Sequence, residues 1–150
     1  MADTKKDPVS SNLFFIDFGS RGNGYFSSVS GGGTEVSVIE HVETTEKGGV
    51  IYRATPGNKK FTALELQRGI TADFALWDWF QLVIDGKIEE ARTGGSLVAL
   101  DSEGKSEVAR WNLVDAWCSK LTFPKLDAKS NELAMEGMTI QHRGMIRVKV

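Results

Sequence analysis

Apolar and polar residues alternate over much of this chain with the two-residue period of half-buried β-strands. The alternation is clearest in residues 35–43, 61–66, 108–117 and 131–141. Clusters of Gly, Asn, Asp, Ser or Pro separate these runs, as is typical of turns between strands. The pattern therefore predicts a mainly β protein whose strands follow one another in antiparallel hairpins.

The two ends of the chain add three strands to this prediction. Residues 13–18 are apolar on both faces, so we expect a central or covered strand there. The following glycine-rich stretch, 19–24, contains an Asn-Gly pair and predicts a hairpin turn, after which residues 25–29 return. Residues 145–150 close the chain as a strand.

The stretch from Ala72 to Ile84 has a different period and predicts the one good helix of the chain. Thr71 can cap the free N–H groups of its first turn, and Asp73 suits the positive end of the helix dipole. Gly86 follows the last apolar position and predicts the C-terminal stop.

This helix carries more apolar surface than an ordinary surface helix needs. At 100° per residue, its apolar side chains fill an arc of about 160°, against about 100° for a typical stripe. The side chains in that arc are Leu76, Trp77, Trp79, Phe80, Val83 and Ile84. Because large exposed apolar patches are rare on monomers, we expect self-association. The alternative is that residues 87–95 or the N-terminus cover this face within the same chain.

Together these elements predict two packed antiparallel sheets, a β-sandwich or partly open barrel, with one flanking helix. The 150 residues suit a single domain, 1–150, in which the polar residues 1–10 form a loose N-terminal segment. Within 108–117, the alternation places Trp111, Leu113 and Asp115 on one face and Ala116 on the opposite face.

A long hairpin, Thr34–Ala54, has strand-forming flanks and a polar tip from His41 to Lys47. The prediction treats Pro56 to Asn58 as an interruption after it. A protruding hairpin exposes unpaired strand edges, which natural proteins usually pair or cover. Pairing with another subunit is one solution, and an ordinary mobile hairpin is the alternative.

Charge and composition argue against nucleic acid and membranes as partners. The net charge is −2 and the only basic cluster is at the C-terminus, so no basic surface for sequence-specific nucleic-acid binding is expected. No segment reaches the roughly 20 apolar residues of a membrane helix. The start of the chain lacks the apolar stretch of a signal peptide, so we expect the protein to be made and folded in a cytoplasm.

No residue pattern in the chain indicates catalysis, a cofactor or a metal. The single cysteine, Cys118, lies in a strand-like context and is interpreted as a small buried apolar side chain. The two histidines, His41 and His142, have no metal-ligand spacing. The glycine runs lack the lysine and the strand-to-helix position of a phosphate loop. We therefore expect no catalytic, cofactor-binding or metal-binding residues.

An ordered series of short motifs resembles the tail-tube proteins of contractile phages and related injection systems. The motifs span roughly residues 10–147. They are Asp17-Phe18-Gly19, Phe26 to Gly31, Glu46-Lys47-Gly48-Gly49, Pro56-Gly57-Asn58, Leu64 to Thr71, Leu76-Trp77-Asp78-Trp79, Trp111 to Trp117 and Asn131 to Glu136. Many members have Ala-Trp-Pro where this chain has Ala116-Trp117-Cys118, which leaves the strand boundary after Trp117 open.

The resemblance implies a structural subunit of an inner tube rather than an enzyme. It implies hexameric rings that stack into a hollow tube inside a contractile sheath, which is driven through a target envelope and conducts protein or DNA cargo. Expected partners are the chain itself and the sheath, baseplate and terminator proteins of a phage tail or phage-tail-like particle. The alternative function is a monomeric β-barrel module that binds a small apolar ligand, with the helix and its tryptophans lining the pocket.

By position, the resemblance assigns ring-to-ring and subunit contacts to the hairpin and the helix. The candidate residues are His41, Val42, Glu43, Glu46, Lys47, Gly48, Gly49, Trp77, Trp79 and Phe80. Trp77 and Trp79 are about 200° apart on a helix and therefore cannot both face the same partner. Lumen residues are not assigned, because a slip of one residue in strand register reverses the faces.

Overall fold

The strand β8 (Glu107–Thr122) takes part in both layers of the molecule. The computed structural model describes residues 13–69, 74–124, 126–129 and 134–150. The other strands are β1 (Leu13–Asp17), β2 (Asn23–Phe26), β3 (Ser28–Gly31), β4 (Thr34–Thr44), β5 (Val50–Phe61), β6 (Leu64–Gly69), β7 (Thr93–Leu100), β9 (Met135–Gln141) and β10 (Gly144–Val148). The helical segments are η1 (Gly19–Arg21), α1 (Ala75–Ile84) and α2 (Ile88–Ala91).

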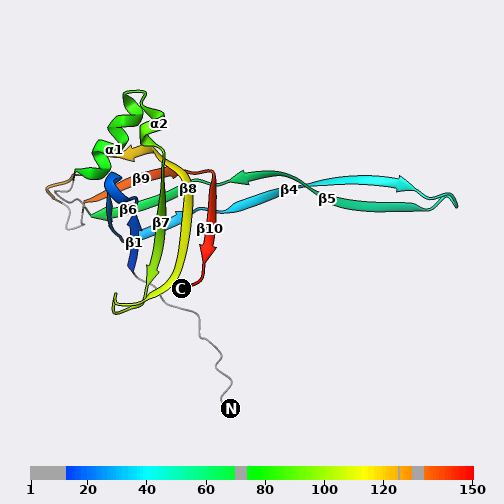
Figure 1. Ribbon diagram of the computed structural model, residues 1–150, viewed down its shortest axis with the longest axis horizontal. Coiled ribbons are helices and arrows are strands. Elements are labelled where there is room, and N and C mark those ends of the chain that lie inside the picture. The colour runs from blue at the N-terminus through cyan, green and yellow to red at the C-terminus, as the bar shows by residue number, and fades with distance from the viewer. Residues whose placement is uncertain (1–12, 70–73, 125, 130–133) are drawn as a thin grey trace, which may run out of the picture.

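All strand pairs are antiparallel, and eight of the described strands form one curled sheet with the order β2-β1-β7-β8-β9-β6-β3. The first half of β8 pairs with β7 and with β10, and its second half pairs with β9. The sheet therefore folds over on itself at β8 and forms two layers (Figure 1). The predicted class, two packed antiparallel sheets with one flanking helix, is confirmed.

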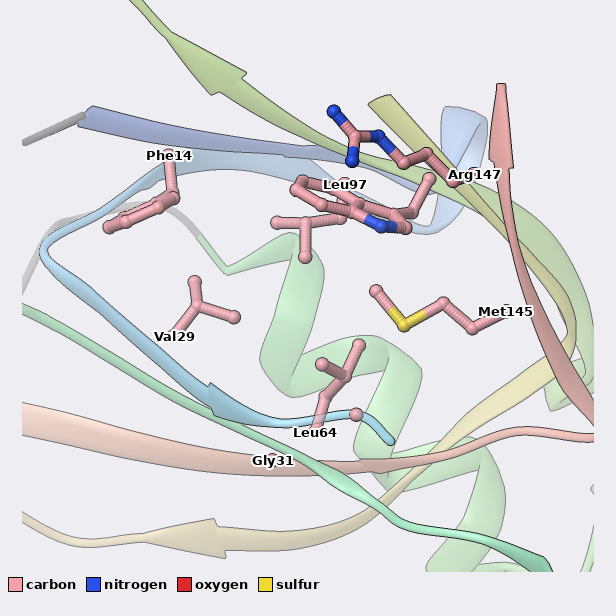
Figure 2. Close-up of a pocket in the computed structure, with 9 residues that line it drawn as sticks. Phe14, Val29, Gly31, Leu64, Leu97, Met145 and Arg147 are labelled. Atoms are coloured by element: carbon pink, nitrogen blue, oxygen red, sulfur yellow. The ribbon is translucent and has the colours of Figure 1, made fainter. Parts of the chain in front are cut away.

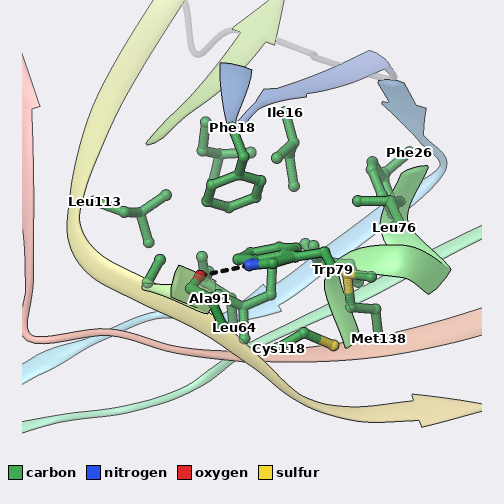
Figure 3. Packing of buried hydrophobic residues seen from close by; sticks show 14 residues of the cluster. Ile16, Phe18, Phe26, Leu64, Leu76, Trp79, Ala91, Leu113, Cys118 and Met138 are labelled. Carbon is green, nitrogen blue, oxygen red and sulfur yellow. Dashed lines mark hydrogen bonds between the residues drawn. The ribbon is translucent and has the colours of Figure 1, made fainter. Parts of the chain in front are cut away.

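The core fills the space between the two layers and is closed by α1 (Figure 3). The strands contribute alternate residues, as Leu64 and Leu66 on β6 show. The helix contributes Leu76 and Trp79, and α2 contributes Ala91. The core joins segments that are far apart in the sequence, so burial of apolar surface fixes how the layers stack.

The end of α1 matches the prediction, whereas its start cannot be compared. Gly86 has a φ of +80°, donates to the carbonyl of Val83 and is followed by Lys87, which donates to the carbonyl of Leu82. These two bonds form a glycine-terminated helix end. The predicted cap Thr71, together with Asp73, lies outside the described residues, as does the predicted loose segment 1–10.

Two predicted turns are placed differently in the structure. The turn after β1 is the 3-10 segment η1, and the Asn-Gly pair lies inside β2, where Asn23 pairs with Asp17. The stretch Pro56 to Asn58 does not end the hairpin, because β5 continues through it to Phe61. A bulge between Val36 and Val38 absorbs the irregularity.

The prediction for the faces of β8 was wrong beyond Val114. Asp115 has a φ of +46°, and the register with β7 shifts by one residue beside it. This bulge turns Ala116 into the core, although simple alternation places it opposite Leu113. The strand then continues past Trp117 and Cys118 to Thr122, which settles the boundary that the missing proline left open.

Candidate assembly surfaces

The β4–β5 hairpin projects from the body as a two-stranded ribbon (Figure 1). Every residue of β4 is exposed, and every residue of β5 is exposed except Gly57 and Phe61, which are partly buried. Its register runs from Thr34 opposite Phe61 to Thr44 opposite Val50. An isolated two-stranded ribbon is marginally stable in water, so this hairpin is expected to gain stability by packing against another structure.

One face of the distal hairpin is apolar. Side chains alternate along each strand, and residues directly opposite each other share a face. Val38 and Val42 therefore lie on one face with Pro56 and Tyr52, the β5 residues opposite them. This apolar hairpin face consists of Val38, Val42, Thr44, Val50, Tyr52, Ala54 and Pro56, with Glu40 as its one charged member. Val42 is 58% exposed and Tyr52 is 81% exposed. Such contiguous exposed apolar surface marks an interaction site.

The opposite face carries a small network of charged side chains. Glu43 accepts from Arg53 at 3.0 Å and lies 3.5 Å from His41. Because all three side chains are well exposed, these ion pairs contribute little to stability. The exposed side chains of Ile39 and Ile51 lie on this face beside the charged ones. This face is therefore mixed, whereas the first face is mainly apolar.

The tip of the hairpin is a short turn that holds itself together. Thr45 donates its N–H to the carbonyl of Gly49 at 2.8 Å, and its hydroxyl accepts from the N–H of Gly49 at 2.9 Å. Gly48 has a φ of +80° and donates to the carbonyl of Thr45. Glu46 and Lys47 between them are exposed. The tip is thus ordered by its own bonds.

Trp79 belongs to the core of its own subunit. Its side chain is 1% exposed, and its ring lies 4.6 Å from that of Phe18, measured between centroids. Its indole N–H donates to the carbonyl of Ala91 on α2 at 2.6 Å (Figure 3). The segment after α1 therefore covers this side of the helix, which agrees with the alternative prediction that residues 87–95 cover it. Trp79 has no surface left for another subunit, and we withdraw it as a contact residue.

Trp77 points the other way and remains a candidate for contact. It is 46% exposed and packs edge-on against the partly buried Phe80, with 6.2 Å between ring centroids. Phe74, immediately before the helix, and Ile84, its last residue, are more exposed still. Together with Trp77 these side chains form an apolar helix ridge, defined as Phe74, Trp77 and Ile84, which is exposed among the described residues. The helix's excess apolar surface is therefore divided between the core and this ridge.

An apolar cavity of about 380 Å³ lies between the two layers (Figure 2). Its lining residues are Phe14, Val29, Gly31, Gly32, Leu64, Leu97, Trp111, Met145 and Arg147. Several of these point inward yet remain only partly buried, so solvent reaches the interior here. The ligand-binding alternative predicted a pocket lined by the helix, but no residue of α1 lines this cavity.

Two buried polar groups were missed by the sequence analysis. Arg68 points into the interior with Leu64 and Leu66, lies 3.6 Å from Glu136 and sits over the ring of Phe26. His142 is buried, and its Nε2 lies 2.8 Å from the carbonyl oxygen of Thr62. Arg68 lies two and four residues after the two leucines and therefore on the same face of the strand. This spacing could have predicted its burial. Arg68 joins β6 to β9 and to Phe26 of β2, and His142 joins the end of β9 to the residues before β6.

The described part of the chain has a shielded thiol and no grouped set of metal ligands. Burial raises the pKa of the Cys118 thiol to about 12, so it stays protonated and unreactive at neutral pH. In the described part of the chain, no three His, Cys, Asp or Glu side chains are grouped to hold a metal ion. No helix in that part is long and apolar enough to cross a membrane.

The ten predicted contact residues separate into two places. His41, Val42 and Glu43 lie on the distal hairpin, with Glu46, Lys47, Gly48 and Gly49 at or beside its tip. Trp77 and Phe80 lie on α1. Apart from Trp79, these assignments remain predictions.

The chain was compared with sequence families and with solved structures. The sequence profile of the family described as T4-like virus tail tube protein gp19 matches residues 10–146. No curated protein sequence matches the chain.

Several solved structures match nearly the whole chain. The sheath-tube complex of the extracellular contractile injection system PVC contains a chain with 24% identity and a TM-score of 0.80, covering 97% of this chain and 95% of that one. A chain of the PVC sheath/tube terminator has 23% identity and a TM-score of 0.76, covering 97% of this chain and 100% of that one. A chain of the anti-feeding prophage baseplate has 20% identity and a TM-score of 0.71, covering 97% of this chain and 97% of that one. At these identities the likeness establishes the fold.

Proposed function

This chain belongs to the T4-like virus tail tube protein family and is a structural tube subunit, and we propose that a single domain, 1–150, assembles into stacked hexameric rings. The profile match from residue 10 to 146 carries the family assignment. As a member of this family, the protein is a component of a phage tail or phage-tail-like injection particle. The rings enclose a channel through which cargo passes when the tube is driven through a target envelope.

The projecting hairpin is the observation that best supports assembly. A ribbon with every β4 residue exposed has two unpaired edges and an apolar face, both of which a monomer would leave in water. Contact with neighbouring copies within a ring and between rings covers both. We assign this role to the hairpin, with Trp77 and Phe80 in the subunit wall.

The body of the molecule offers further unpaired edges for a ring. Among the described residues, β2 and β3 end the strand order, and β10 pairs only with β8. A heterologous contact between copies that closes on itself gives a ring, and stacking of rings leaves open ends that grow. Ring closure therefore removes edges that the single chain exposes.

The sheath, baseplate and terminator proteins of such a particle are the proposed partners. The similar chains come from a sheath-tube complex, a sheath/tube terminator and a baseplate. Helix α1, which carries the apolar helix ridge, lies away from the projecting end of the hairpin (Figure 1). It is available to a partner while the hairpin contacts another copy.

Size-exclusion chromatography with light scattering and negative-stain electron microscopy tests the proposed function. We expect the purified chain to form rings or tubes well above the 16.5 kDa of one copy. A compact monomer at all concentrations, with a small apolar molecule bound in the cavity between the layers, would instead support the ligand-binding alternative.

A further inference from the structure

The cavity between the layers opens between two strand edges, of β3 and β10, that have no partner in the part of the chain that the structure describes. Val29 and Gly31 of β3 line one side, and Met145 and Arg147 of β10 line the other. Among the described residues, β3 pairs only with β6, and β10 pairs only with β8. Apolar side chains of both layers face the gap (Figure 2). The domain has thus left part of its own interior open to a side chain from outside.

Arg147 is the one charged residue in the lining of this cavity. It is exposed, and its guanidinium carbon lies 5.8 Å from the centre of the Trp111 ring. No carboxylate among the described residues forms an ion pair with it. A cation at the rim of an apolar cavity favours an occupant that combines apolar groups with one negative charge.

The apolar hairpin face has this composition. Glu40 is its one charge, it has no ion-pair partner among the described residues, and it lies between Val38 and Val42 on β4. Across the ribbon, Ala54 is opposite Glu40 and Tyr52 is opposite Val42. The carboxylate is therefore surrounded by apolar side chains.

The hairpin cannot fill the cavity of its own subunit. It begins at Thr34, immediately after β3, and runs outward from the body (Figure 1). A strand of 11 residues extends about 37 Å at roughly 3.4 Å per residue. Its distal half is held in register by continuous pairing from Val38 to Thr44. The occupant of the cavity mouth must come from a second copy.

We propose that the apolar hairpin face of one copy docks on the cavity mouth of a second copy, with Glu40 paired to Arg147 and an adjacent apolar side chain entering the cavity. The proposal rests on the proposed tube function, because it needs copies held side by side. The opposite face, which carries His41, Glu43 and Arg53 beside Ile39 and Ile51, then turns away from the docked copy.

Charge exchange tests the pairing. In assembled protein, we expect Glu40→Arg and Arg147→Glu each to lower the assembled fraction about tenfold or more, because each places like charges together. The double variant restores the pair with its sign reversed, and its assembled fraction returns to within about threefold of the unchanged chain. Glu103→Arg, in the exposed turn between β7 and β8, is the matched control and leaves assembly unchanged. Far-ultraviolet circular dichroism verifies that every variant is folded.

Crosslinking tests the geometry independently. Chains carrying Glu40→Cys and Arg147→Cys are assembled and treated with a short bismaleimide, while buried Cys118 stays unreactive. We expect crosslinks between copies, and far fewer when the hairpin cysteine is at position 39, which faces the opposite side. Equal crosslinking from both positions, or no recovery in the double charge variant while the unchanged chain assembles, overturns the docking but leaves the tube function intact. An unchanged chain that stays monomeric refutes both.

Discussion

Trp77 and Trp79 are two positions apart on α1 and have opposite environments. Trp79 lies against Phe18 and donates its indole N–H to Ala91, whereas Trp77 is about half exposed beside Phe80. A helix rotates by about 200° over two residues, which accounts for the difference. One tryptophan therefore fixes the helix on the body, and the other is available to a neighbour.

Substituting each tryptophan by glutamate separates these roles. Trp79→Glu places an unpaired charge in the core and removes a large buried ring, so we expect the free energy of unfolding to fall by at least about 3 kcal/mol. Trp77→Glu should cost about 1 kcal/mol or less and instead weaken assembly. Urea denaturation monitored by circular dichroism measures both. Equal destabilisation by the two variants would contradict the assignment.

Cys118 gives a prediction about pH. Burial raises its pKa from 9.0 to about 12, so the folded state keeps the proton that the unfolded chain loses. The thiol's contribution to stability is therefore full below about pH 9 and declines as the pH rises toward 12. The difference in unfolding free energy between the unchanged chain and Cys118→Ala should shrink from pH 7 to pH 10.

Thiol labelling measures the same burial directly. We expect Cys118 to react with Ellman's reagent in urea and not in the native protein at pH 8. Rapid native labelling would show that the strand around Cys118 opens easily.

At the scale of elements, the hairpin is the part of the fold that its own subunit supports least. It is held by pairing between β4 and β5 and by the bonds of its tip, and its side chains are almost all exposed. The body, in contrast, has a core that joins both layers and α1. Removing part of the hairpin should therefore affect assembly rather than folding.

A shortened hairpin tests this independence. Val42 and Tyr52 are directly opposite, so a two-residue Asn-Gly turn can replace residues 43–51. We expect the melting temperature to stay within a few degrees, about what a change of 1 kcal/mol produces, while stacking of rings is lost. Calorimetry and electron microscopy measure the two effects. Normal tubes from this variant would remove the tip from the account of stacking.

The sequence predicted elements well wherever alternation was uninterrupted. The hairpin and the helix were found because their periods differ and because Gly86 can adopt a positive φ. The reversal of faces at Asp115 was not predictable, since a bulge at a residue other than glycine leaves no mark in the alternation. Pro56 was taken as an end of the strand, but an unpaired ribbon edge tolerates proline.

At the scale of the whole molecule, the candidate site depends on pairings that the sequence does not reveal. Arg147 and Val29 come together at the cavity mouth only because β10 pairs with β8 and β3 pairs with β6. The hairpin residues were predicted because they are local to one segment. A site formed between layers needs the tertiary arrangement, and the cavity was therefore found only in the structure.

At the scale of the whole molecule, the exposed strand edges, hairpin face and cavity can all be covered by contact between copies. The molecule's described residues include strand edges without partners, a hairpin with an apolar face and a cavity left open between the layers. A single copy leaves all three in water, whereas a ring of copies covers them. Membership of the tail tube family gives the reason for this incompleteness.

Cryo-electron microscopy of the assembled protein tests the central claim most directly. The account predicts closed sixfold rings stacked into a hollow tube, with the β4–β5 hairpin of each copy packed on another copy. A reconstruction in which the hairpin stays free in solvent, or in which the copies form no closed ring, would contradict it.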